Sequence, residues 1–175
     1  MNMKTPGLVL AMTLLGCSSG PPDGTETMLD AYAAAVAGMH TLTDGYVEDV
    51  AVAGDVDDVA DLMSAYSDAL SHELEELAHL VEDIESCSMG ADGMEMADQA
   101  HDDVGAIQVL LDELGAEHAT HTDVTQCQSS ATAHESGLDS RFDTLAAHYD
   151  HWHDMDMRCE SHEDDEDDDN AEHVD

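Results

Sequence analysis

The sequence predicts an all-α protein, an up-down-up-down four-helix bundle followed by a disordered acidic C-terminal tail. Between Thr25 and Arg158 apolar residues recur at steps of three and four, which is the period of a helix. The same stretch contains no proline. Three short breaks divide it into four amphipathic segments, and no useful run of alternating apolar and polar residues indicates a strand.

The first two segments lie on either side of a break at Ala53–Asp55. Residues of the first segment expected to face the core are Leu29, Tyr32, Val36, Met39, Leu42 and Tyr46. Those of the second are Met63, Tyr66, Leu70, Leu74, Leu77, Val81 and Ile84. Gly38 and Gly45 weaken the first segment as a helix and leave its end undefined.

The third and fourth segments follow breaks at Ser88–Gly93 and between Gly115 and Thr122. Residues of the third segment expected to face the core are Ala100, Val104, Ile107, Leu111 and Leu114. Those of the fourth are Leu138, Phe142, Leu145, Tyr149 and Trp152. Because the links are short, each segment should run antiparallel to the one before it. Together the four segments are predicted to form a bundle over residues 25–159.

The charge of the chain limits its partners. The 175 residues include 42 Asp and Glu against 3 Lys and Arg, a formal net charge of −39. Nucleic-acid binding requires clustered basic residues, so this composition excludes it. The same excess of acidic residues argues against electrostatic docking on anionic lipid. Cations or cationic surfaces remain as partners. The last sixteen residues, 160–175, hold ten acids and are predicted to form a disordered, solvated tail.

The N-terminus has the features of an export signal. Lys4 precedes an apolar run, Leu8–Leu15, that is too short to cross a bilayer and fits the hydrophobic region of a signal peptide. The run ends in Leu14-Leu15-Gly16-Cys17, which resembles the lipobox of bacterial lipoproteins.

That resemblance has three implications. Residues 1–16 would be a cleaved signal peptide, Cys17 would be lipidated and insert into the bilayer, and residues 17–24 would be a flexible tether. The protein would then be lipid-anchored in the cell envelope. Ser18 after the cysteine implies the outer membrane, facing the periplasm, if the cell is Gram-negative.

Three further cysteines fall in phase with the apolar residues of their segments. In an up-down-up-down bundle the second and fourth segments end at the same pole, so Cys87 and Cys159 are predicted to form a disulfide. Cys127 would lie roughly 40 Å away, at 1.5 Å of rise per helical residue, as a free and buried thiol. The alternative for Cys127 is an inter-chain disulfide that links a dimer.

The enzyme-like motifs of the chain are incomplete. A di-iron bundle needs E-x-x-H on each of two helices, and the body of the chain has only Glu76–His79. Helical phase turns Glu76, His79 and the neighbouring His72 away from the core. The sequence contains neither a complete zinc-protease motif nor a complete calcium loop. We therefore expect a protein that is not an enzyme.

Histidine and methionine gather near the end of the fourth segment and at the second connection. The candidate metal ligands there are His148, His151, His153, Met155, Met157, His101, Met94 and Met96. Imidazole suits zinc and copper(II), whereas thioethers select copper(I), so copper or zinc is the expected cofactor if a metal is bound. At the opposite pole lie His40, His118, His121 and His134. His118 and His134 fall in core phase, which is more typical of structural histidines than of ligands.

Two functions remain open. The first is a lipid-anchored, non-enzymatic protein of the cell envelope that sequesters copper or another divalent ion at its His/Met-rich pole. The second is a structural or partner-binding acidic lipoprotein adapted to high salt, with no specific metal site. Under the second hypothesis other proteins of the same genome should be comparably acidic.

Overall fold

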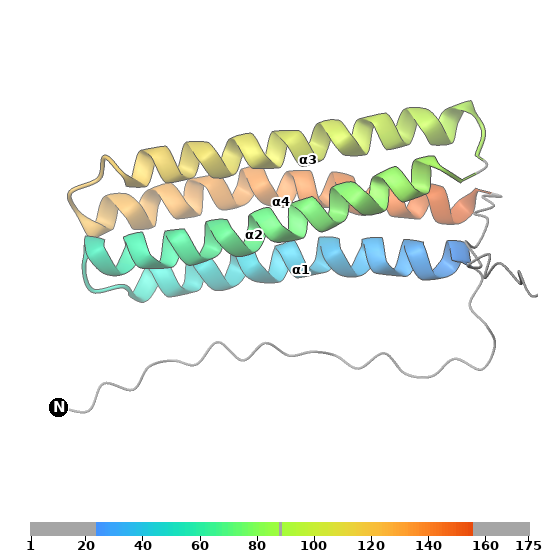
Figure 1. Ribbon diagram of the computed structural model, residues 1–175. Helices are drawn as coiled ribbons and strands as arrows, with labels where there is room; N and C mark the ends of the chain where they lie inside the picture. Colours follow the sequence, from blue (N-terminus) through green and yellow to red (C-terminus); the bar gives the residue numbers. More distant parts are fainter. Residues whose placement is uncertain (1–23, 88, 156–175) are drawn as a thin grey trace, which may run out of the picture.

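The computed structural model describes residues 24–87 and 89–155, and in them four helices form one antiparallel bundle. The helices are α1 (Gly24–Val52), α2 (Val56–Glu85), α3 (Ala91–His118) and α4 (Val124–Asp154). They alternate in direction and lie side by side along their whole length (Figure 1). Each packs against its neighbours in the chain, and α1 against α4 closes the ring. The predicted fold class is confirmed for this part of the chain.

The two ends of the bundle differ. At the end that we call the closed end lie the α1–α2 connection, residues 53–55, and the α3–α4 connection, residues 119–123. At the other end, the open end, α1 begins, α4 ends and α2 connects to α3 (Figure 1). The first and last described residues of the bundle, Gly24 and Met155, therefore lie at the same end.

Acidic residues start two of the helices. The Asp55 carboxylate accepts a hydrogen bond from the Asp58 backbone N–H at 2.9 Å, and the Asp123 carboxylate accepts one from the Thr125 N–H at 2.7 Å. Each satisfies a backbone donor that the helix itself leaves unpaired, and its negative charge favours the helix N-terminus. These caps mark the first and third connections. α3 starts after Gly90 without a side-chain cap, and Gly38 and Gly45 do not interrupt α1.

The core consists of the apolar stripes of all four helices, and most of the predicted positions are buried. Three predictions differ: Leu42, Val104 and Tyr149 are only half-buried. Beside the last two, Asp103 and His148 are buried. At this point along the bundle, the buried position of α3 and of α4 is the residue before the predicted one. Two polar side chains, Asp103 and His148, therefore lie in the interface between these helices.

The remaining predictions about the chain ends lie outside the described residues. They concern Cys17 and its lipidation, the signal peptide and tether, Cys159, and the acidic tail. None of the helices in residues 24–87 and 89–155 is both long enough and apolar enough to cross a membrane.

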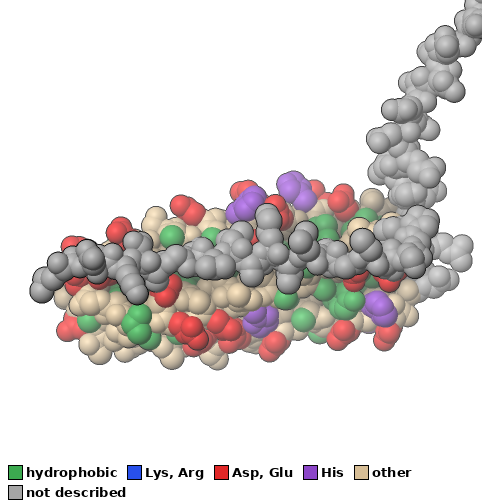
Figure 2. Space-filling model, turned by 90° about the horizontal axis from the view of Figure 1, so that it is seen from below, with side chains coloured by type: hydrophobic (Ala, Val, Ile, Leu, Met, Phe, Trp, Pro, Cys, Tyr) green, Lys and Arg blue, Asp and Glu red, His purple; other side chains and the backbone are tan. Residues whose placement is uncertain are grey.

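The surface carries the negative charge of the chain along the whole bundle. On the face shown in Figure 2, acidic side chains are spread from end to end with histidines among them. Arg141 is the one Lys or Arg of the described part, since Lys4 and Arg158 fall outside it. Local neutralisation therefore depends on histidine, on Arg141 or on ions from solution.

Candidate functional site

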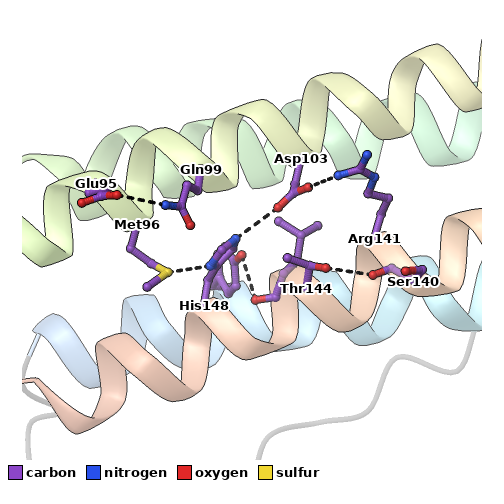
Figure 3. Close-up of polar contacts among 10 residues, drawn as sticks. Glu95, Met96, Gln99, Asp103, Ser140, Arg141, Thr144 and His148 are labelled. Carbon is purple, nitrogen blue, oxygen red and sulfur yellow. Dashed lines mark hydrogen bonds and ion pairs between the residues drawn. The ribbon is translucent and has the colours of Figure 1, made fainter.

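The described residues contain a buried polar cluster between α3 and α4, centred on His148. The His148 side chain is 6% exposed. Its Nε2 atom lies 3.2 Å from Asp103 Oδ2, and its Nδ1 atom lies 2.7 Å from Met96 Sδ. Asp103 and Met96 are two turns apart on α3, so they flank the imidazole ring on opposite sides (Figure 3).

Arg141 balances the charge of the buried carboxylate. Its Nη1 donates a hydrogen bond to Asp103 Oδ1 at 2.6 Å, while the other carboxylate oxygen faces His148. The Asp103 side chain is 10% exposed and that of Arg141 is 47% exposed, so the guanidinium reaches the carboxylate from the rim of the interface. A buried charge is strongly destabilising when unpaired, and this pairing removes that penalty.

The partners of His148 define which nitrogen carries its proton. An ionised Asp103 can only accept, so Nε2–H is the donor in the neutral ring. In this tautomer the lone pair is on Nδ1 and faces the sulfur of Met96, which also only accepts, so the 2.7 Å contact is a hydrogen bond only when Nδ1 carries a proton. A histidine whose second ring N–H is held by a carboxylate is the usual arrangement of a metal ligand. Imidazole and thioether together are donors that suit copper.

The structure does not bring the other predicted ligands to this cluster. His151, His153 and Met94 are exposed, and His101 pairs through Nε2 with Glu85 Oε1 at 3.4 Å. Met157 lies outside the described residues.

The reason is the phase of α4. Trp152, one turn after His148, takes the core position at 0% exposure and donates from Nε1 to the Gly93 carbonyl at 3.4 Å. His151 and His153, the neighbours of this tryptophan in the chain, are thereby turned to solvent.

Two more thioethers meet beyond Trp152, at the open end. A Cβ atom placed on Gly93 would lie 2.8 Å from Met89 Sδ and 3.0 Å from Met155 Cε. Both methionines therefore lie over this glycine. Trp152 contacts both Gly93 and His148, since its Nε1 donates to the Gly93 carbonyl and its ring centroid lies 6.0 Å from that of His148.

The cysteines of the described part differ in state. Cys87 is disulfide-bonded, and its predicted partner Cys159 lies outside the described residues, so that pairing stays a prediction. Cys127 is a free thiol at 1% exposure, and burial raises its pKa. Such burial disfavours the disulfide-linked dimer, because Cys127 would have to leave the core to react.

Sequence reasoning missed Asp103 and Arg141. The signal was present, since Asp103 lies three residues after Ala100 and four before Ile107, which is the step of the core stripe. Val104 lies four residues after Ala100 and three before Ile107, so it fits the helical period equally well. Because Val104 is apolar, the sequence favours it over Asp103 as the core residue.

Of the histidines predicted at the closed end, His118 is buried and pairs with the Tyr46 hydroxyl at 3.2 Å, as expected for a structural histidine in core phase, and the His134 side chain is 13% exposed. His40 lies along the α1–α4 interface, with Nδ1 3.4 Å from Asp139 Oδ1. His118, His121 and His134 gather instead around Glu117 at the α3–α4 connection.

Comparisons with protein-family models, curated proteins and solved structures found no match to this chain. Among residues 24–87 and 89–155, no three His, Cys, Asp or Glu side chains are arranged to hold a metal ion between them.

Proposed function

We propose that the protein is a lipid-anchored, non-enzymatic component of the cell envelope that binds a transition-metal ion, copper first, near its open end. The observation that carries the proposal is the His148 ring, with Nε2 held by Asp103 and Nδ1 facing Met96 Sδ. The lipobox resemblance at Cys17 supports the anchor. The proposed role is sequestration, and it requires no turnover.

Reduced copper is the ion that this donor pair fits best. A thioether is a soft ligand that selects copper(I), and a neutral imidazole is compatible with it. The acidic surface adds an unspecific contribution, because a net charge of −39 raises the local concentration of cations. Binding requires the neutral form of His148, so affinity should fall in acid.

A competition titration with a chromophoric copper(I) chelator tests the proposal on the full chain. His148→Gln and Met96→Leu should each weaken copper(I) binding by roughly 10- to 100-fold, a range already seen when only an outer-shell partner is lost. His151→Gln and Met94→Leu are matched controls, because these side chains are exposed in the same region. Equal effects in the two sets of variants would contradict the site.

A second candidate function is a structural or partner-binding acidic lipoprotein adapted to high salt. It is favoured by the charge of −39 and by the lack, in the described part, of a three-residue His, Cys, Asp or Glu metal cluster. Under this proposal Asp103, His148 and Arg141 are a structural ion-pair network. Stoichiometric copper would leave the stability unchanged, whereas bulk salt would raise it.

A further inference from the structure

A groove of about 610 Å³ lies between α1 and α2, the two helices that contribute nothing to the His148 cluster (Figure 1). Its floor is one face of α1, formed by residues that follow at steps of one, three and four: Ala31, Ala34, Ala35 and Gly38. Its wall is one face of α2, formed by Glu73, Glu76, His79, Leu80 and Asp83. These residues span about 10 Å along α1 and about 15 Å along α2, or roughly two to three helical turns.

The floor of the groove is uncharged, although the chain is strongly acidic elsewhere. Residues 31–39 contain no Asp, Glu, His, Lys or Arg, whereas the whole chain has 42 acidic residues. Two of the four floor residues are exposed and two are half-buried. A Cβ atom placed on Gly38 would lie 3.7 Å from Glu73 Oε2, so the carboxylate lies beside the one floor position without a side chain. Small residues of this kind allow the backbone of another helix to approach closely.

The wall of the groove carries negative charge that lacks a cationic partner. Glu76 Oε1 lies 3.4 Å from His72 Nε2. Among residues 24–87 and 89–155, neither Glu73 nor Asp83 has a Lys, Arg or His side chain at ion-pair distance. Glu73 is also half-buried, and a carboxylate that loses part of its hydration is stabilised when a cation pairs with it.

We propose that this groove binds a basic amphipathic helix of a partner protein, with small or aliphatic side chains against α1 and Lys or Arg side chains against the carboxylates of α2. Apolar anchors at steps of three and four are the usual means by which a helix binds in a groove. The floor supplies the uncharged surface for such anchors, and the wall supplies the complementary charge. Because the contact is only two to three turns long, we expect an affinity of about 1 µM or weaker, the weak end of the range for larger interfaces.

Charge argues against this chain itself as the occupant. A second copy would bring acidic helices against an acidic wall. Arg141, the one Lys or Arg of the described part, pairs with Asp103 between α3 and α4. Residues 160–175 hold ten acids and no Lys or Arg. The attraction therefore has to come from basic residues of another protein, and the net charge of −39 favours their approach.

A peptide titration followed by backbone ¹H–¹⁵N correlation spectra tests the groove on the full chain. The probe is a helical peptide of about 16 residues, with Ala and Leu on one face and Lys on the other, and its control is a scrambled peptide of the same composition. The amphipathic peptide should saturate at one per chain and shift the signals of residues 31–38 and 73–83. It should bind roughly 10-fold or more tightly than the scrambled peptide, the contribution of one buried Leu side chain.

Substitutions separate the floor of the groove from its wall. Ala34→Gln places a larger uncharged side chain on the floor and should weaken binding roughly 10-fold or more, the scale of overpacking. Since Ala34 is exposed and Gln is a good helix former, the variant should still fold. Glu73→Gln should weaken binding roughly 2- to 5-fold, as for one ion pair near the surface. Ala146→Gln on α4 and Glu113→Gln on α3 make the same changes at exposed positions and should stay within about twofold of wild type.

Three results would overturn the site. Equal binding of the two peptides, or equal losses in the groove and control variants, would leave only unspecific attraction by charge. Shifts of the groove signals with protein concentration alone would assign the groove to a second copy.

This inference goes beyond the proposed copper function and can fail separately from it. His148→Gln should leave peptide binding unchanged, and Ala34→Gln should leave copper(I) binding unchanged. Loss of one activity without the other therefore assigns the failure to one of the two sites.

Discussion

Asp103 organises the polar cluster between α3 and α4, because its two carboxylate oxygens contact Arg141 and His148 separately. Such a cluster stabilises the bundle only while all its members are present. Removing one partner of a buried charged pair leaves the other without compensation, whereas replacing both by apolar residues is often neutral.

A double-mutant cycle tests this at the scale of single residues. Asp103→Leu and His148→Leu should each lower the free energy of unfolding by about 1–3 kcal/mol, because each leaves a buried polar group without its hydrogen-bond partner. The double variant should be more stable than either single variant, because the Arg141 guanidinium is 47% exposed and can turn to solvent. Urea unfolding measures all four proteins. Additive losses would mean that the two side chains are not coupled.

His118 gives the stability a pH dependence of known sign. Its folded-state pKa lies below the ordinary value of 6.5, so the unfolded chain binds more protons in the window between the two. The contribution of the neutral ring is complete above about pH 6.5 and is lost as the pH falls below it. Glu117, whose pKa is also lowered, loses its contribution only below about its ordinary 4.5.

The measurement compares wild type with His118→Gln by denaturant unfolding at several pH values. The comparison is needed because protonation of the other carboxylates relieves repulsion and acts in the opposite direction. We expect the stability advantage of wild type to shrink between about pH 7 and pH 5. An advantage that grows in acid would show that the folded state favours a protonated His118.

At the scale of the helices, the three connections lie at the predicted breaks, although α3 extends by a few residues into the break on either side, and the phase of α3 and α4 differs from the prediction. Asp55 and Asp123 cap α2 and α4 through local contacts, so the sequence could predict these boundaries. The choice between Asp103 and Val104 depends on how α3 meets α4, and neighbouring positions in a stripe fit a helical period equally well. The burial of His148 beside Asp103 therefore depends on how α3 packs against α4, which the sequence pattern of either helix alone does not determine. The proximity of Met89 and Met155 at Gly93 follows from the topology, which brings the end of α4 and the α2–α3 connection to the same end of the bundle.

Two glycines of α3 provide a matched test of packing at the open end. At Gly105 a Cβ atom meets nothing within 4 Å, so Gly105→Ala should stabilise the protein by about 0.5–1 kcal/mol through helix propensity. At Gly93 the same atom would lie 3.0 Å from the Met89 Cβ and 2.8 Å from its Sδ. Gly93→Ala should therefore be less stable than wild type in thermal unfolding. A similar gain at both positions would contradict the packing of Met89 and Met155 over Gly93.

At the scale of the whole molecule, stability depends on how the charge of −39 is screened. The Debye length falls from about 30 Å at 0.01 M salt to about 3 Å at 1 M, so repulsion between surface carboxylates is screened progressively over this range. We expect the melting temperature to rise strongly over this range, because self-repulsion weakens the compact state. A sharp melt at the same temperature throughout would contradict the repulsion argument.

Whether a specific ion adds to this screening is the central question, and one thermal-unfolding experiment answers it most directly. Wild type, His148→Gln and His151→Gln are melted in buffer alone and with sodium chloride, calcium, zinc, oxidised copper or reduced copper. We predict that stoichiometric reduced copper raises the melting temperature of wild type and of His151→Gln, and that His148→Gln loses this rise. A rise with bulk salt and calcium only, equal in all three proteins, would contradict the metal site and favour the salt-adapted structural role.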